Sequence, residues 1–287
     1  NVGAALVSIL FLLFKEHFVE DWRYTMIGFS IFSIILFICW LIFSHDFEPT
    51  ITWKHPNYFV YKLLIESKEI LHEEDAKKYT YADGFKDKFI YVFSLGFGGF
   101  LFLYVMPLVS LPRVVAEHAH NASFKAEFMI LTVTVGGIFG TIFSLLVTRK
   151  LNFRRKPFLI VHGILMIGFM ALGLYFVSTN VILAYTMFSL SGFFMYSQYP
   201  VYLNLPYELP NMNSQRLTIM FGIFWAFGYA IYTLFNFTWS LVLNHMGYNS
   251  SIIFYLLGSL IYIIFVFTFP ETRPKKKFFK SLEMNFT

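Results

Sequence analysis

Long apolar runs separated by short polar stretches dominate this chain. A helix needs about 20 apolar residues to cross the core of a lipid bilayer. By this measure the pattern predicts eight membrane-spanning helices, at residues 2–14, 24–44, 89–111, 127–147, 158–177, 181–203, 217–243 and 251–269. The polar break Ser178-Thr179-Asn180 is brief, yet the apolar residues around it are too many for one crossing. We therefore expect two helices joined there by a tight turn.

Residues 45–88 form the one long polar insertion between these runs. Apolar side chains recur within it at helical spacing, at Phe59, Val60, Leu63, Leu64, Ile70 and Leu71. This spacing predicts an amphipathic helix that lies at the membrane surface or caps the spans. The acidic residues that follow, Glu73, Glu74 and Asp75, are interpreted as a solvated face rather than as a metal site.

The composition excludes an ordinary soluble domain. Hydrophobic residues make up 57% of the chain and charged residues only 14%, so we expect an all-α, multi-pass membrane protein. The single cysteine, Cys39, rules out an intramolecular disulfide and a cysteine-based metal site. The net charge of +5 is explained by membrane topology, because the basic residues flank apolar spans; no nucleic-acid partner is expected.

Basic residues are distributed unevenly among the loops. When alternate loops are assigned to one side, eighteen of the 22 lysines and arginines fall there and four on the other side. Without the long 45–88 insertion the ratio is still eleven to four. Short loops rich in Lys and Arg stay in the cytoplasm. The pattern therefore predicts a multi-pass protein of the cell membrane, with both ends of this sequence in the cytoplasm.

Three short segments stand out beside the spans. They are VTRKLNFRRKP at 147–157, FPETRPKKK at 269–277 and DWRYTMIGFS at 21–30. Together with the order of two spans, a charged loop, six spans and a basic tail, they resemble the last two-thirds of a major facilitator superfamily (MFS) transporter. Arg149, Arg154 and Arg155 match the basic positions of a family motif. In that motif Thr148 and Asn152 replace the usual Asp and Gly.

The resemblance implies a bundle of twelve helices in two halves, of which this sequence would be a fragment holding helices five to twelve. Residues 1–44 would then complete the N-terminal half, 45–88 the linker, 89–270 the six-helix C-terminal half and 271–287 a basic tail. A loose repeat between residues 20–49 and 246–274 favours such related halves. The implied protein is a monomeric secondary active or facilitative transporter that moves a small solute by alternating access and needs no cofactor.

Polar side chains inside a span need partners or a wet cavity, so their stripes are the candidate solute-binding positions. In the span 217–243, residues Trp225, Tyr229, Tyr232, Asn236 and Trp239 share one helical face. From these stripes we select as substrate-binding candidates Thr134, Tyr196, Gln198, Tyr199, Trp225, Tyr229, Tyr232 and Asn236. Trp239 is interpreted as an interfacial anchor. Hydrogen bonding between helices remains an equal alternative for Tyr229, Tyr232 and Asn236.

Charged residues are absent between the predicted span ends, apart from Glu127 at an edge, and His162 is the one histidine there. A proton or another cation could be a coupling partner only through groups elsewhere, and facilitated diffusion stays open. The span 89–111 lacks a pair of glutamines typical of sugar carriers, which disfavours a hexose. The substrate classes that stay open are a nonpolar or zwitterionic metabolite and an organic anion held mainly by the other half.

The basic loop has two interpretations. Arg149, Arg154 and Arg155 could form a gating latch that bonds helix ends or carboxylates when the inner gate closes, or they could be topology anchors only. A membrane-embedded enzyme acting on lipid is a rival, with Glu117, His118 and His120 as its one candidate grouping; simple solvation is the favoured interpretation of these residues. A non-transporting receptor fits eight spans badly.

Overall fold

The computed structural model describes residues 22–43, 79–118, 123–150, 153–209, 212 and 214–272. All regular structure within these residues is helical. The described residues divide into two compact units, one containing α2 and the other everything from Thr80 onward. The predicted span 2–14, the predicted amphipathic helix and the basic tail lie outside the described residues.

The first unit contains α2 (Trp22–Phe43), a helix of 22 residues. At about 1.5 Å per residue it is long enough to cross an apolar core about 30 Å thick. Apolar side chains such as Ile31, Phe32 and Ile34 are exposed along it. A helix that presents apolar side chains in this way is stable in lipid rather than in water.

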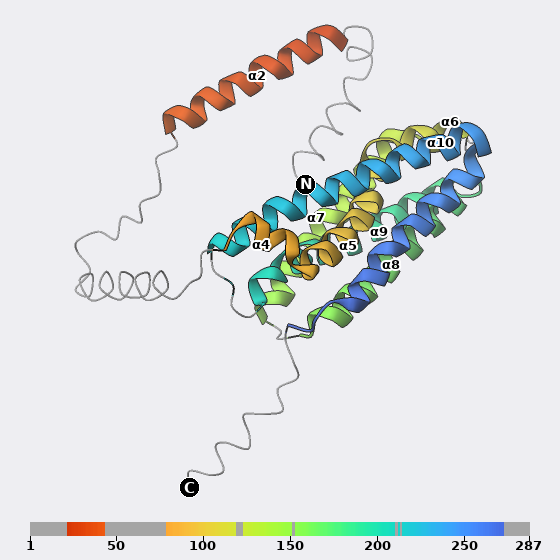
Figure 1. Cartoon of the computed structure of the whole chain (residues 1–287). Helices are drawn as coiled ribbons and strands as arrows, with labels where there is room; N and C mark the ends of the chain where they lie inside the picture. The colour runs from red at the N-terminus through yellow and green to blue at the C-terminus, as the bar shows by residue number, and fades with distance from the viewer. Residues whose placement is uncertain are drawn as a thin grey trace. The chain divides into compact units, whose positions relative to one another are not determined.

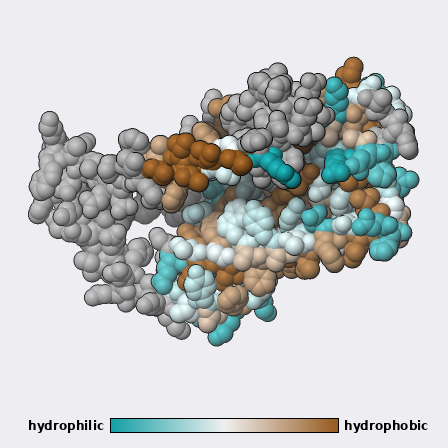
Figure 2. Space-filling view, turned by 90° about the horizontal axis from the view of Figure 1, so that it is seen from above, coloured by the Kyte–Doolittle hydropathy of each residue, from teal (hydrophilic) through white to brown (hydrophobic). Residues whose placement is uncertain are grey.

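The second unit is a bundle of long helices with short ones at their ends (Figure 1). Its elements are α4 (Tyr81–Lys86), α5 (Lys88–Val105), η1 (Met106–Leu108), α6 (Leu111–His118), α7 (Ala126–Lys150), α8 (Arg155–Phe176), α9 (Val181–Asn204), η2 (Pro206–Glu208) and α10 (Ser214–Thr268). Four segments are long and apolar enough to cross a membrane: Lys88–Leu108, Ala126–Val147, Arg155–Phe176 and Gln215–Thr268. In Figure 2 much of the surface is apolar or pale, and hydrophilic side chains are prominent at the right and also occur at the lower left edge.

Two turns are made with very few residues. Asn180 ends the break between α8 and α9, where its side chain accepts a hydrogen bond from the backbone N–H of Leu183 (3.1 Å). α10 reverses at Gly247 alone, whose φ of 80° lies in the left-handed region that glycine tolerates. We call residues 214–246 the first arm of α10 and residues 248–268 its second arm.

Close helix contacts hold the second unit together. A Cβ atom at Gly136 or Gly140 of α7 would lie only 1.9 or 2.1 Å from a backbone oxygen of α9, at Ser189 or Phe193. The α5 helix approaches both arms of α10 in the same way: a Cβ at Gly98 would meet Ile231, and one at Gly99 would meet the backbone of Tyr262. Small residues are required wherever helix backbones come this close in a membrane.

Candidate functional site

Near-parallel aromatic rings line the contact between α5 and α9. The Phe93 and Tyr202 rings lie 4.5 Å apart at 12°, Phe100 and Tyr199 5.7 Å apart at 6°, and Tyr104 and Tyr199 5.7 Å apart at 17°. We call the set the ring stack; its members are Phe93, Phe97, Phe100, Tyr104, Tyr199 and Tyr202. The α5 members recur every three or four residues and so share one face of the helix. The stack is fully buried at Phe93 and Phe100 and ends on the half-buried Tyr104 and Tyr199.

Tyrosines from three helices meet at the half-buried end of the stack. The Tyr104 and Tyr199 rings lie 5.7 Å apart at 17°. Tyr229 lies within electrostatic range of Tyr199, and Tyr232 lies within electrostatic range of Tyr229. Tyr196, only 2% exposed, lies against Tyr104 with its ring 5.1 Å away and tilted by 60°. We call Tyr104, Tyr196, Tyr199, Tyr229 and Tyr232 the tyrosine cluster. It joins α5, α9 and the first arm of α10 on one face.

The tyrosine cluster is polar but uncharged. Residues 89–105, 181–204 and 217–243, which supply it, contain no Asp, Glu, Lys, Arg or His. The Trp225 ring stacks on Tyr229 (5.8 Å, 22°), and Tyr229 is 48% exposed. The arrangement therefore offers ring faces and hydroxyl groups, which can hold a solute by stacking and by hydrogen bonds without a permanent charge.

Charged side chains gather at one end of the second unit, where α8 begins and α10 ends. The guanidinium of Arg155, only 6% exposed, donates to both carboxylate oxygens of Glu208, with the shortest contact at 2.7 Å. The backbone N–H of Arg155 donates to Glu271 (2.9 Å), and the Thr272 hydroxyl donates to Glu208 (2.5 Å). These bonds tie the start of α8 to η2 and to the segment after α10.

Two further contacts belong to the same end. Arg216, at the start of α10, forms an ion pair with Asp87, which caps α5 (3.1 Å). Lys156 donates to the backbone carbonyl of Phe267 in the last turn of α10. We call this set of helix ends, with Arg155 at its centre, the charged end.

Comparison with known families decides the identity of the chain. The family described as "Mycoplasma MFS transporter" matches residues 1–244. The chain belongs to this family. The predicted family and the predicted all-α membrane fold are thereby confirmed, and the protein is an MFS transporter embedded in a membrane and acting on a small molecule. A comparison with curated proteins finds no match.

The structure of this MFS transporter brings most of the predicted substrate-binding residues together. Tyr196, Tyr199, Tyr229 and Tyr232 lie in the tyrosine cluster, and Trp225 stacks on it. Asn236 lies one helical turn beyond Tyr232 on the same face of the first arm and is half-buried. Sequence reasoning missed Tyr104; the signal was its spacing of four from Phe100 in the span 89–111.

Two predicted substrate-binding residues of the MFS transporter lie outside the tyrosine cluster, in buried helix contacts. Gln198 has no exposed surface; it accepts a hydrogen bond from the Tyr262 hydroxyl (2.8 Å) and donates to the sulfur of Met166 (3.0 Å). Thr134 is equally buried and donates to the carbonyl of Ile130 in its own helix (2.7 Å). Both side chains therefore serve helix packing in the described structure.

The structure of the MFS transporter describes the side chains of two of the three predicted gating arginines. Arg155 binds Glu208, and Arg154 lies 3.5 Å from Glu271, so both pair with acids of their own unit. Neither acid was predicted as a partner. Arg149 belongs to the last turn of α7, but its side chain lies outside the described residues.

In the MFS transporter, two residues of the rival grouping Glu117, His118 and His120 contact other side chains. The His118 ring stacks on Tyr248 (5.0 Å, 4°). Glu117 accepts a hydrogen bond from Arg113 (2.8 Å), which raises the pKa of that guanidinium. His120 lies outside the described residues. Among the described residues, no three His, Cys, Asp or Glu side chains come together to hold a metal ion.

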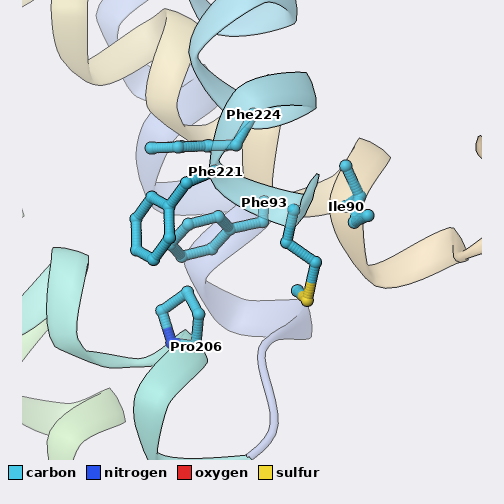
Figure 3. Close-up of a pocket in the computed structure, with 6 residues that line it drawn as sticks. Ile90, Phe93, Pro206, Phe221 and Phe224 are labelled. Atoms are coloured by element: carbon cyan, nitrogen blue, oxygen red, sulfur yellow. The ribbon is translucent and has the colours of Figure 1, made fainter. Parts of the chain in front are cut away.

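A small apolar cavity lies between α5, η2 and the first arm of α10 (Figure 3). It is lined by Ile90, Phe93, Pro206, Met220, Phe221 and Phe224 and measures about 10 Å³. That is the space of about one water molecule, and an apolar lining keeps such a space dry. The cavity is too small to hold a solute.

Proposed function

We propose that this MFS transporter moves a small uncharged or zwitterionic solute by alternating access, and that the tyrosine cluster is part of its solute site. The observation that carries the proposal is the meeting of Tyr104, Tyr199 and Tyr229, from three helices, on one partly exposed and uncharged face. Ring faces and hydroxyls bind a neutral solute weakly enough to release it, whereas a buried charge would hold an ion of opposite sign.

We further propose that residues 89–270 move as one half of the transporter. The close glycine contacts between α7 and α9 and between α5 and α10 support rigid-body movement, because packed helices resist sliding at such distances. The partly exposed Tyr229 then faces the opposing half, which would cover the solute when the halves close.

The charged end supports a stabilising role for Arg154 and Arg155. Their partners, Glu208 and Glu271, belong to the same described unit, so these bonds join helix ends within one half. We propose that the charged end faces the cytoplasm, as the loop charges predict. Opening of the inner gate would then leave the Arg155–Glu208 pair intact.

Coupling to an ion receives no support from the described spans. A proton-coupled site normally contains a titratable carboxylate within the membrane. The segments that form the tyrosine cluster contain none. We therefore propose facilitative movement through this half, with any coupling group located outside the described spans.

The proposal is tested by counterflow. The full chain would be purified, reconstituted in liposomes and assayed for exchange of labelled uracil, glucose, alanine and choline. We expect exchange of at least one solute, and a rate up to about tenfold lower in Tyr229→Ala, since loss of one aromatic contact costs about 0.5–1.5 kcal/mol.

The matched control is Tyr175→Ala. Tyr175 is 72% exposed on α8, outside the cluster, so its loss should leave the rate unchanged. Equal rates in the wild type and Tyr229→Ala would remove the tyrosine cluster from the solute path. Absence of exchange for all four solutes would count against transport by this chain.

A further inference from the structure

We infer that the solute is a planar heterocycle with hydrogen-bonding edges, of the nucleobase or nucleoside class, and that it stacks on the half-buried end of the ring stack. This inference rests on the proposed function, because it names the substrate class of the same site. Three features carry it: the parallel rings, the uncharged surroundings and the available hydroxyl groups.

The six rings of the stack are near-parallel, while the Tyr196 ring beside them is tilted by 60° to Tyr104. Every stacked pair from Phe93 to Tyr104 differs in plane by at most 23°. Offset-parallel packing is the arrangement in which a further flat ring gains most contact. A planar ligand placed against Tyr104 and Tyr199 would simply lengthen the stack by one member.

The end of the stack is accessible while its beginning is not. Phe93, Phe100 and Tyr202 are sealed among α5, α9 and α10, whereas Tyr104 and Tyr199 are only partly buried. Trp225 meets Phe97 of the stack edge-on, at 86° and 5.0 Å, and carries Tyr229 on its face. The Trp225–Tyr229 pair is thus steeply inclined to the stack and can contact the rim of a ligand that lies on it.

An organic cation is disfavoured by the surroundings. Ring faces attract quaternary ammonium groups. Within a membrane, however, a cation that gives up its water is normally paired with an acidic side chain. Residues 89–105, 181–204 and 217–243 contain no such acid. A neutral ligand avoids this desolvation cost.

The edges of the site favour a heterocycle over a plain aromatic ring. The hydroxyls of Tyr199, Tyr229 and Tyr232 and the amide of Asn236 form no hydrogen bond with any residue that the structure describes. Each hydroxyl can donate once and accept twice, and the amide does both. The ring nitrogens and carbonyls of a nucleobase complement such groups, while stacking holds the ring itself.

The test uses direct binding to the purified full chain in lipid nanodiscs. Tritiated adenine and tritiated uridine are the probes, measured by scintillation proximity, with unlabelled glucose and choline as competitors. We expect saturable binding of adenine or uridine that neither competitor displaces. Tyr104→Ala should weaken it about five- to a hundred-fold, the range that loss of one stacking ring produces.

Variants separate stacking from folding. Tyr104→Phe keeps the ring and should bind within a few-fold of the wild type. Trp225 fluorescence tests where adenine binds. Adenine should quench the tryptophan fluorescence of the wild type. This quenching should vanish in Trp225→Phe and persist in Trp239→Phe. Tyr175→Ala should bind as the wild type does.

The outcomes are distinct. No saturable binding of adenine or uridine overturns the inference, and so does displacement by glucose or choline. If those two fail while another solute exchanges in a Tyr229-dependent way, the proposed function stands and the substrate class is wrong. If adenine or uridine binds at the cluster but no solute exchanges, the class stands and transport by this chain is wrong.

Discussion

Arg155 is the side chain whose loss we expect to be most costly. Its guanidinium is almost fully buried and bidentate on Glu208, which also accepts from Thr272. Removing one partner of a buried pair leaves the other uncompensated, at about 3–5 kcal/mol. Arg155→Ala should therefore lower the free energy of unfolding by about that amount, measured by denaturant titration in mixed micelles.

The neighbouring arginine provides the comparison. Arg154 is 49% exposed and its contact with Glu271 is long, at 3.5 Å. An exposed pair is worth about 1 kcal/mol or less, so Arg154→Ala should be nearly neutral. If both variants unfolded alike, the charged end would not stabilise the helix ends as described.

At the scale of single residues, a repeating stripe predicts which side chains share a helix face, whereas partners that are remote in the sequence leave no local pattern. The three- and four-residue spacing of Tyr229 and Tyr232 indicated a shared face. Gln198 was assigned with Tyr199, but adjacent residues point about 100° apart on a helix, which turns Gln198 into the bundle. Glu208 lies 53 positions from Arg155, so no local pattern could predict their contact.

At the scale of helices, the close contact between α7 and α9 can be tested at Gly140. Any side chain at Gly140 must displace the backbone of Phe193, since a Cβ there would lie 2.1 Å from its carbonyl oxygen. Overpacking of this kind costs about 1–3 kcal/mol. Gly140→Ala should thus unfold at lower denaturant concentration than the wild type.

Gly168 of α8 is the matched control. A Cβ there has no neighbour within 4 Å, and alanine favours a helix over glycine, so Gly168→Ala should be neutral or slightly stabilising. Equal destabilisation of the two variants would mean that helix propensity, and not the close contact, decides the result.

The elements themselves were largely predictable, because about 20 apolar residues in lipid have little alternative to a helix. The predicted span 158–177 corresponds to α8 and the span 181–203 to α9. The exception is the polar stretch between 243 and 251, which we expected to separate two spans. There the helix continues to Gly247 and resumes directly after it, since one left-handed residue is enough to reverse the chain.

For the molecule as a whole, the proposed orientation can be measured. In a Cys39→Ser background, a cysteine replaces Thr179 in the α8–α9 turn or Asn204 at the end of α9; both positions are exposed. Thr179→Cys should react with a membrane-impermeant maleimide in intact cells, and Asn204→Cys only after permeabilisation. The reverse labelling pattern would place the charged end outside.

The order of the spans followed from hydropathy and loop charge, but the assembly of the site did not. Tyr104, Tyr199 and Tyr229 come from three helices that are far apart in the sequence, and single-chain periodicity gives only the face of each helix. Which faces meet depends on the close contacts at Gly98, Gly137 and Gly228, where ring or aliphatic side chains fill the place of a Cβ.

The reversal at Gly247 has a consequence for how the protein is made. Because one residue separates the two arms of α10, no loop lies between them that could keep one arm in water while the other enters the bilayer. We therefore expect the two arms to enter the membrane together, as a single helical hairpin.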